Sequence, residues 1–419
     1  MGNRKSFWGG VLTGVLSVII VAAGIYLGST AWNLHRLANA QNSAENQKTT
    51  EEQSEESETG SSVANAGTLR KIEVLESAID QFYLEEADEG TLESGIYKGL
   101  VESLGDPYST YYTAEELADV EEKSSGVYYG IGAYVGIDTA TALPILTGII
   151  EGTPAQESGL RAGDLVYKVD GQDIQGMELS QAVGLIKGEE GTSVRLTIIR
   201  EGETDYLEID VVRRRVESPT VAYEMLDDRI GIIGIAEFDD ITVDQFAEAL
   251  AVLRGSGMEG LILDLRGNPG GNLSAVCEIA RQILPEGLIV YTEDKYGQRD
   301  EYTCDGTRQM TEELVVLINE GSASASEIMA GAVKDYEIGT LVGTTTFGKG
   351  IVQRVLTLTD GSAVKLTVSS YFTPKGNNIH EIGVEPDVEE PFDADAYYDE
   401  GIDNQLDKAI EVMNGLLAE

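Results

Sequence analysis

Residue types that often carry catalysis or hold small folds together are scarce in this sequence. In a chain of 419 residues, histidine occurs only at His35 and His380, and cysteine only at Cys277 and Cys304. Because a cysteine or histidine metal site needs a cluster of such residues, the sequence offers no metal site. The two cysteines permit one disulfide, and we interpret them instead as two partly buried free thiols.

Basic residues are also in deficit. The chain has 29 lysines and arginines against 73 aspartates and glutamates, a formal net charge of −44 at pH 7. Such a chain repels nucleic-acid phosphates, so nucleic acid is excluded as a partner. Anionic lipid repels it in the same way, so membrane contact must come from an inserted segment. The length and an apolar content of 42% suffice for two or three domains.

Charge is absent altogether from residues 7–28. An apolar stretch of about 20 residues spans a bilayer as a helix, and Arg4 and Lys5 before it place residues 1–6 in the cytoplasm. The rest of the chain then lies on the extracytoplasmic side of a cell membrane. The alternative is a cleaved signal peptide, because residues 38–40 have the form of a cleavage site. We favour an uncleaved anchor, since a signal peptide has an apolar core of only about 7–15 residues.

Composition divides the next part of the chain into two segments. Residues 29–67 are too poor in apolar side chains to fold, which predicts a disordered linker. Residues 68–123 are helical in pattern, with a second helix expected over residues 92–104, and we interpret them as a packing or self-association element. The apolar face of the first helix comprises Leu69, Ile72, Leu75, Ile79 and Phe82.

Two larger segments containing strands follow. Residues 124–213 are punctuated by glycine and rich in short strands, with a hairpin turn expected at Asp170 and Gly171. In residues 214–392 short apolar runs, including residues 288–291, alternate with helical stretches. This alternation predicts a layered α/β domain with buried, largely parallel strands. Residues 393–419 are predicted to form a C-terminal helical segment.

The first segment with catalytic potential is GSASASEI at residues 321–328. It lies between a predicted buried strand and a helix, and its small residues suit a tight turn that exposes a side chain to substrate. The N-terminus of the helix also offers N–H groups to a developing oxyanion. A purely structural interpretation stays open, because Ser324 and Glu327 have the spacing of a capping box.

The second segment is TTTFGKGIVQ at residues 344–353. Lys349 lies between two glycines in apolar surroundings, and burial beside Ser324 would lower the pKa of its ammonium group, so that it acts as a base. Gln353 could hydrogen-bond this amine and orient it. The alternative is an exposed lysine in a hairpin. A phosphate-binding loop is excluded, because Gly350 follows Lys349 where that motif needs serine or threonine.

The third segment is LDLRGNPGG at residues 263–271, a predicted buried strand that runs into a glycine-rich loop. Its backbone N–H groups could complete an oxyanion hole, and it lacks the GxGxxG pattern of dinucleotide sites. A serine–histidine–aspartate triad would depend on His380, since His35 lies close to the predicted membrane helix. No pattern links His380 with the serine turn, so catalysis without histidine is predicted.

With these three blocks in this order, the chain resembles the carboxy-terminal processing (tail-specific) serine peptidases, from about Leu69 to its end. LGDPYS at residues 104–109 resembles the block before the PDZ module of that family. GNNIH at residues 376–380 together with GVEPD at residues 383–387 resembles the block that closes its catalytic domain. The resemblance implies a crotonase-like α/β catalytic domain, a small β-rich PDZ domain, helical elements at both ends and one N-terminal transmembrane helix. The chain is similar to the shorter branch of the family.

The resemblance also implies roles for individual residues. Ser324 would be the nucleophile, Lys349 the general base and Gln353 the residue that orients Lys349. The oxyanion would be bound by the N–H of Ala325 and of a glycine in the 267–271 loop, for which we take Gly270. The PDZ loop that holds a peptide's terminal carboxylate would comprise Tyr129, Gly130, Ile131 and Gly132.

The function implied is that of a serine endopeptidase which cleaves extracytoplasmic proteins near their C-termini, without metal or cofactor. Its PDZ domain would recognise an apolar C-terminal tail and deliver it or gate the active site. Partners would be protein or peptide substrates with free C-termini, the membrane through the N-terminal helix, and a second copy of the chain through the N- and C-terminal helices. Two alternatives are a catalytically silent PDZ adaptor at the membrane surface and an enzyme acting on acyl thioesters.

Overall fold

The computed structural model describes residues 62–418. The predicted membrane helix at residues 7–28 lies outside this part, as does most of the predicted linker. Along the described stretch no helix is both long and apolar enough to cross a membrane. The chain divides into two compact units, residues 1–87 and residues 88–419.

In the first unit the described residues form helix α2 (Ala66–Phe82), as the apolar periodicity predicts. The side chain of Asn65 caps it by accepting hydrogen bonds from the backbone N–H groups of Gly67 and Thr68. None of its residues is buried, and the predicted apolar face leaves Leu69, Leu75 and Phe82 exposed.

The second unit begins with helices α3 (Glu89–Glu102) and α4 (Ala114–Ser125), joined through strand β1 (Thr110–Tyr112). The glycine-punctuated segment then forms a sheet in the order β3 (Ala133–Asp138), β4 (Leu143–Ile149), β5 (Leu165–Val169), β7 (Ser193–Ile199), β8 (Leu207–Val212), with β6 (Gln172–Asp173) beside β5. Asp170 and Gly171 have φ of 51° and 83°, which confirms the predicted turn.

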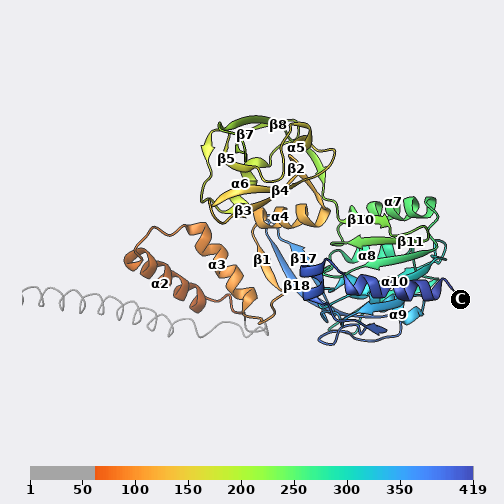
Figure 1. The fold of residues 1–419 in the computed structure, drawn as a ribbon. Helices are drawn as coiled ribbons and strands as arrows, with labels where there is room; N and C mark the ends of the chain where they lie inside the picture. The colour runs from red at the N-terminus through yellow and green to blue at the C-terminus, as the bar shows by residue number, and fades with distance from the viewer. Residues whose placement is uncertain (1–61, 419) are drawn as a thin grey trace, which may run out of the picture. The chain divides into compact units, whose positions relative to one another are not determined.

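Two further features concern the edge of this sheet and the rest of the segment. Strand β3 is an edge strand, so its outer side is open, and helix α6 (Leu179–Ile186) packs near it. Strand β2 (Val127–Gly130) pairs with β9 (Arg214–Glu217), and helix α5 (Pro154–Glu157) completes the segment (Figure 1). An open strand edge beside a helix can accept an extended peptide as an additional strand.

The predicted α/β layer is present. Its sheet runs in the order β10 (Val221–Met225), β11 (Ile230–Ile235), β12 (Gly260–Asp264), β15 (Glu313–Ile318), β16 (Thr340–Gly343), β19 (Val388–Glu389), and all pairs except β10–β11 are parallel. Apolar residues alternate between its two faces: Leu314 and Val316 face one core, and Val315 and Leu317 the other.

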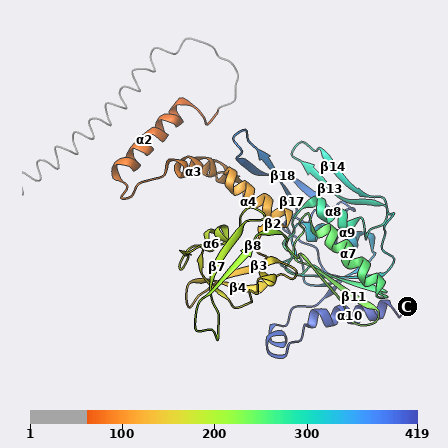
Figure 2. The same cartoon turned by 90° about the horizontal axis from the view of Figure 1, so that it is seen from above.

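Helices cover both faces of this sheet. On one side lie α7 (Thr242–Gly255), α8 (Leu273–Ala280) and α9 (Ala325–Tyr336), and on the other lies α10 (Asn404–Leu416). Figure 2 shows the layers in sequence: α10, the sheet with β11, the helices α7 to α9, and then strands β13 and β14. The carboxyl ends of the parallel strands carry the loops in which the catalytic candidates lie.

The apolar run at residues 288–291 was wrongly counted among the parallel strands. It belongs to β13 (Gly287–Asp294), which pairs antiparallel with β14 (Arg299–Cys304) and with β18 (Ala363–Phe372) in a second sheet. Strands β1 and β17 (Ile351–Thr357) also pair with β18. A short apolar run does not distinguish the two arrangements, because strands buried on both faces have the same pattern in either.

The C-terminal segment was expected to contribute to a dimer interface. A π-helical turn (Ala396–Glu400) precedes α10, and α10 packs its apolar side on β12, β15 and β16 of its own chain, with Ala409 and Met413 fully buried. This surface is therefore used within the chain. Both cysteines are free and buried, as we expected: Cys277 lies on α8 and Cys304 at the end of β14.

Candidate active site and peptide groove

Ser324 lies at the junction between β15 and α9, as the residue pattern predicts. Its backbone has φ 53° and ψ −111°, a conformation that residues with a Cβ rarely adopt. The side chain is half-buried and is the N-cap of α9, and Ala325 is the first residue of that helix. A sharp strand-to-helix turn of this kind exposes a nucleophile, and the N–H of Ala325 is one that the helix itself does not use.

Glu327 joins the serine turn to the lysine loop. Its side chain is fully buried and accepts four hydrogen bonds. Oε2 accepts from the backbone N–H of Ser324 and of Lys349, each over 2.8 Å. Oε1 accepts from the N–H of Gly348 over 2.7 Å and from the hydroxyl of Thr346 over 2.6 Å. One carboxylate therefore holds the backbones of both catalytic candidates, a role that the capping-box spacing only partly indicated.

Lys349 is half-buried, and its ammonium group lies 4.7 Å from the centre of the Tyr108 ring. Burial lowers the pKa of Lys349 below its ordinary value and the charge of Lys365 lowers it further, whereas Glu327 and Asp106 act in the opposite direction. Within residues 62–418 no hydrogen bond joins this ammonium group with the Ser324 hydroxyl. The backbone of Lys349 thus lies close to that of Ser324, whereas its ammonium group lies against the Tyr108 ring.

The block at residues 104–109 contributes directly to the surroundings of Lys349. Besides Tyr108, it supplies Asp106, whose carboxylate accepts hydrogen bonds from the Ser109 hydroxyl over 2.5 Å and from the Tyr108 N–H over 3.0 Å. The Ser109 hydroxyl in turn accepts from the N–H of Thr367 on β18. No role in the site was predicted from the sequence for the residues of this block.

Gln353 is hydrogen-bonded to β18, and within residues 62–418 no hydrogen bond joins it to Lys349. Its amide nitrogen donates to the hydroxyl of Thr367 over 3.2 Å. Because this hydrogen bond uses the amide nitrogen, the amide oxygen of Gln353 can still accept a hydrogen bond from another group.

Gly270 lies directly against the serine turn. A Cβ on Gly270 would meet Ser324 Cβ and the Ala323 carbonyl oxygen at 2.8 Å and the Ala325 nitrogen at 2.9 Å, and its φ is 108°. Only glycine fits at this position. Its own N–H donates to Asn268 Oδ1 over 2.8 Å, so the expected oxyanion donor has a partner within its loop in this structure.

His380 lies next to the lysine loop. A Cβ on Gly350 would meet the backbone nitrogen of His380 at 2.6 Å, and the N–H of Glu381 donates to the Gly348 carbonyl. Among the residues that the structure describes, no hydrogen bond joins His380 to Ser324. Residues 376–387 thus pack against the backbone of the loop that carries Lys349.

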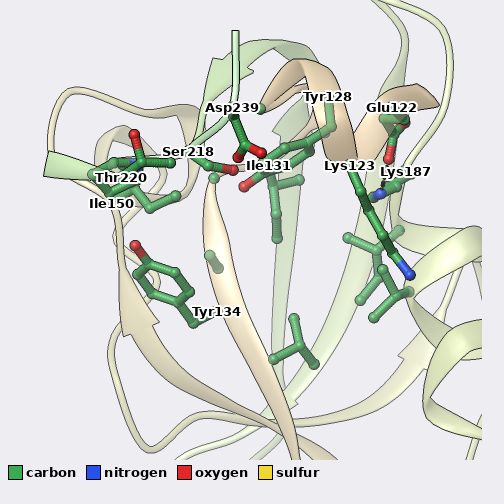
Figure 3. Close-up of a pocket in the computed structure, with 18 of the residues that line it drawn as sticks. Glu122, Lys123, Tyr128, Ile131, Tyr134, Ile150, Lys187, Ser218, Thr220 and Asp239 are labelled. Carbon is green, nitrogen blue, oxygen red and sulfur yellow. Dashed lines mark hydrogen bonds and ion pairs between the residues drawn. The ribbon is translucent and has the colours of Figure 1, made fainter. Parts of the chain in front are cut away.

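A pocket of about 530 Å³ lies between β3, α6 and the strand ends near β11 (Figure 3). Three of the four residues expected to form a carboxylate-binding loop, Gly130, Ile131 and Gly132, line this pocket. The fourth, Tyr129, is 43% exposed, and its neighbour Tyr128 lines the pocket instead. The opposite wall comes from the catalytic domain, through Ser218, Pro219, Thr220, Ala236, Glu237 and Asp239.

This wall is hydrogen-bonded to the glycine loop of the serine site. The N–H of Phe238 donates to the Gly270 carbonyl over 2.8 Å, and the N–H of Asn272 donates to the Phe238 carbonyl over 2.6 Å. A Cβ on Gly271 would lie only 2.3 Å from the Phe238 carbonyl oxygen. Backbone hydrogen bonds therefore connect the wall of the pocket to the glycine loop beside Ser324. The sequence did not indicate this connection.

The structure thus places a serine on a strained strand-to-helix turn, with a half-buried lysine in the loop beside it and a glycine loop against it. Three family models match the chain: Peptidase family S41 over residues 229–390, PDZ domain over residues 145–200 and Activating protease CtpB N-terminal domain over residues 18–116.

Curated relatives extend this match over most of the chain. The Carboxy-terminal processing protease CtpA of Bacillus subtilis is 37% identical over 322 residues, which are 76% of this chain and 68% of the relative. The Carboxyl-terminal-processing protease of Synechocystis is 35% identical over 325 residues, 76% of each chain. Among solved structures, the photosystem II D1 C-terminal processing protease is 31% identical over 76% of this chain and 86% of its own, with a TM-score of 0.45.

The chain belongs to the PDZ-containing carboxy-terminal processing serine peptidases of family S41. It is accordingly a serine endopeptidase, and the alternatives of a silent adaptor and of a thioester enzyme are set aside.

Proposed function

We propose that the chain cleaves extracytoplasmic proteins near their C-termini with a Ser324–Lys349 dyad. The observation that carries the proposal is the shared Oε2 of Glu327, which accepts from the backbone N–H of both residues over 2.8 Å. Two backbones held on one oxygen atom keep their side chains within reach of each other. The lowered pKa of Lys349 suits a base that must be neutral to take a proton.

In the proposed reaction, neutral Lys349 takes the Ser324 proton, and Ser324 attacks the peptide carbonyl. The N–H groups of Ala325 and Gly270 stabilise the oxyanion. As the tetrahedral intermediate collapses, the peptide C–N bond breaks and protonated Lys349 gives its proton to the leaving amine. Neutral again, Lys349 takes a proton from the water that attacks the acyl-enzyme and returns that proton to Ser324 as the new carboxyl end leaves. The reaction requires two local changes in this site. The ammonium group leaves the Tyr108 ring, and the N–H of Gly270 exchanges Asn268 for the oxyanion.

Gln353 is proposed to orient the displaced lysine. Because its amide nitrogen already donates to Thr367, its amide oxygen is the part of the group that can accept from an amine. A side chain fixed at one end to β18 is a suitable support for Lys349 once the lysine has left Tyr108.

The pocket is proposed to bind the C-terminal tail of the substrate. Support comes from the loop at Gly130, Ile131 and Gly132, which lines the pocket, and from the open edge of β3, which can pair with an extended peptide. The hydrogen bond from Phe238 to Gly270 offers a route by which a bound tail acts on the oxyanion loop. This route supports gating of the active site as well as delivery of substrate.

We further propose that residues 7–28 anchor the protein in the cell membrane, with its catalytic part on the extracytoplasmic side. The support is the uncharged apolar stretch and the basic residues before it. A homodimer is proposed through the exposed apolar face of α2, and α10 is left out because its own sheet covers it.

The test is cleavage of an unfolded protein by the full chain in detergent micelles, compared with Ser324→Ala, Lys349→Ala and Gln353→Ala. We expect no cleavage by the first two variants and partial loss in the third, with unfolding transitions unchanged. Mapping the product ends by mass spectrometry checks that cuts fall near the C-terminus. Normal cleavage by Lys349→Ala would refute the dyad.

A further inference from the structure

Asp239 is a buried acid in the wall of the pocket with no partner of its own. The residue is 6% exposed and lines the pocket. Its backbone N–H donates to the Thr242 hydroxyl, but within residues 62–418 no donor lies at hydrogen-bond distance from its carboxylate. Because Asp239 lines the pocket and its carboxylate has no donor among the described residues, the carboxylate is available to a cationic group that enters the pocket.

The position of Asp239 is fixed by short contacts on both sides. The next residue, Asp240, donates its N–H to the Ser124 carbonyl at the end of α4, and Asn272 bonds both Ser124 and the Asp240 carboxylate. A Cβ on Gly126 would lie 3.2 Å from Asp239 Cβ. The backbone next to Asp239 is therefore held in place against α4.

The nearby cations are engaged or directed elsewhere. Lys187 forms an ion pair with Glu122 and lies 5.2 Å from the centre of the Tyr128 ring. Figure 3 shows the ammonium groups of Lys123 and Lys187 on the far side of the pocket from Asp239. Burial raises the pKa of Asp239 to about 6, helped by the charges of Glu237 and Asp240. The catalytic-domain side of the pocket is thus acidic at neutral pH.

We propose that Asp239 is a specificity-determining residue, whose carboxylate binds a lysine or arginine side chain near the carboxyl terminus of the substrate tail. The inference rests on tail recognition as proposed above and names the class of tail. A tail carboxylate held at Gly130–Gly132 would be repelled by Asp239 in the same pocket. A cationic side chain on the tail compensates both negative charges, whereas an entirely apolar tail leaves them opposed.

The charge of the whole protein acts in the same direction. With a formal net charge of −44, the chain attracts basic segments and repels acidic ones before any contact is made. The apolar residues of the pocket, among them Ile131, Val135 and Ile186, remain available to the terminal side chain. The expected tail therefore combines an apolar terminal residue with a basic residue just before it.

The experiment measures peptide binding to the full-length Ser324→Ala protein in detergent micelles, so that peptides are not cut. Fluorescent peptides with an apolar terminal residue carry lysine, norleucine or glutamate at one of the preceding positions. We expect the lysine peptide to bind about tenfold more tightly than the norleucine peptide at about pH 8, and the glutamate peptide to bind worst. Adding Asp239→Asn should reduce the preference for lysine to about twofold or less.

Matched variants separate this site from general charge effects. Asp244→Asn removes the same charge from an exposed position on α7 that does not line the pocket, and it should keep the lysine preference. An equal lysine preference with and without the Asp239→Asn substitution would overturn the role of Asp239 while leaving tail recognition intact. Equal binding of peptides with amidated C-termini, or no binding of any peptide, would overturn tail recognition and the role of Asp239 with it.

Discussion

Two buried carboxylates of the second unit differ in the number of hydrogen bonds that they accept. Glu327 is fully buried between the serine turn and the lysine loop and accepts four hydrogen bonds. Asp239 is 6% exposed in the pocket wall and accepts none from the described residues. The two sites are close in the fold, because Phe238 bonds Gly270 and Gly270 lies against Ser324.

This difference in hydrogen bonding suits Glu327 to a structural role and Asp239 to the ligand-binding role proposed above. A carboxylate that has all its donors within the protein fixes backbone positions and has nothing left to offer a ligand. One without donors destabilises the free protein and gains most when a ligand supplies the missing charge. On this argument, substitution of Glu327 should damage fold and catalysis together, whereas substitution of Asp239 should improve the fold and harm recognition.

Glu327→Gln gives the largest expected effect. An amide places an NH₂ group at one of the two oxygen positions. It then faces either the N–H groups of Ser324 and Lys349 or the N–H of Gly348 and the hydroxyl of Thr346, so hydrogen bonds to one of these pairs are lost. We expect the free energy of unfolding to fall by about 3 kcal/mol or more. Cleavage by the protein that remains folded should fall by about a hundredfold, because the dyad is displaced.

The control for this variant is Glu320→Gln, which makes the same change at an exposed residue whose side chain accepts only from the Thr344 hydroxyl. Its stability should stay within about 0.5 kcal/mol of the wild type. Urea denaturation and cleavage of an unfolded protein substrate measure the two effects. If Glu327→Gln cut at the wild-type rate, the structural role would be refuted.

Asp239→Asn should act with the opposite sign. The raised pKa of about 6 means that the folded state holds a proton on Asp239 more tightly than the unfolded state does. The stabilisation is fully present below the ordinary value of 3.8 and is lost as pH rises through about 6. At about pH 8 the ionised group costs at most about 3 kcal/mol, which the asparagine variant should regain.

The measurement compares urea denaturation of wild type and Asp239→Asn at about pH 8 and about pH 4. The variant should be the more stable protein at the higher pH and should lose that advantage at the lower one. Asp244→Asn serves again as the control and should show no such pH dependence. A less stable Asp239→Asn protein at about pH 8 would mean that the carboxylate has a donor in solution.

Thr346→Val tests a smaller part of the Glu327 arrangement. The Thr346 hydroxyl donates to Glu327 and accepts from the N–H of Val384 over 2.7 Å, and the residue is 5% exposed. Valine keeps the shape and leaves two buried polar groups short of one bond each, at a cost of about 2 kcal/mol. The neighbouring exposed Thr345→Val should change stability by less than about 0.5 kcal/mol. Equal effects of the two variants in thermal unfolding would contradict this account.

The catalytic loops could be predicted because their signals are local. Ser324 and Lys349 each lie in a short run whose small residues and glycines allow few alternatives, and the hairpin at Asp170 and Gly171 follows from turn chemistry. Helix α3 overlaps the helix expected over residues 92–104, and α10 lies within the predicted helical segment 393–419.

The rest depended on side chains that meet across long sequence separations. Tyr108 lies over an ammonium group that follows it by more than two hundred residues, and no period or motif in the chain relates the two. Asp239 is one acid in a run of three within four residues, and only its burial distinguishes it from Glu237 and Asp240. The antiparallel pairing of β13 was missed for a related reason, since pairing partners are a tertiary property.

The smallest predicted effect concerns a second cation near the catalytic lysine. Lys365 lies on β18 with its ammonium group 5.4 Å from the centre of the Tyr112 ring, and its charge lowers the pKa of Lys349. Lys365→Gln removes that charge, so the pKa of Lys349 should rise and the acid limb of the pH–rate profile should move to higher pH. Activity at a pH within that limb should fall a few fold and return at higher pH.

Asp106→Asn should move the same limb the other way, because the charge of Asp106 raises the pKa of Lys349. The opposite signs distinguish electrostatic tuning from damage, since a distorted site loses activity at every pH. Initial cleavage rates across the pH range, measured for both variants and the wild type, give the comparison. Shifts of both variants in one direction would show that another group governs the limb, and Lys349 would then lose its place as the general base.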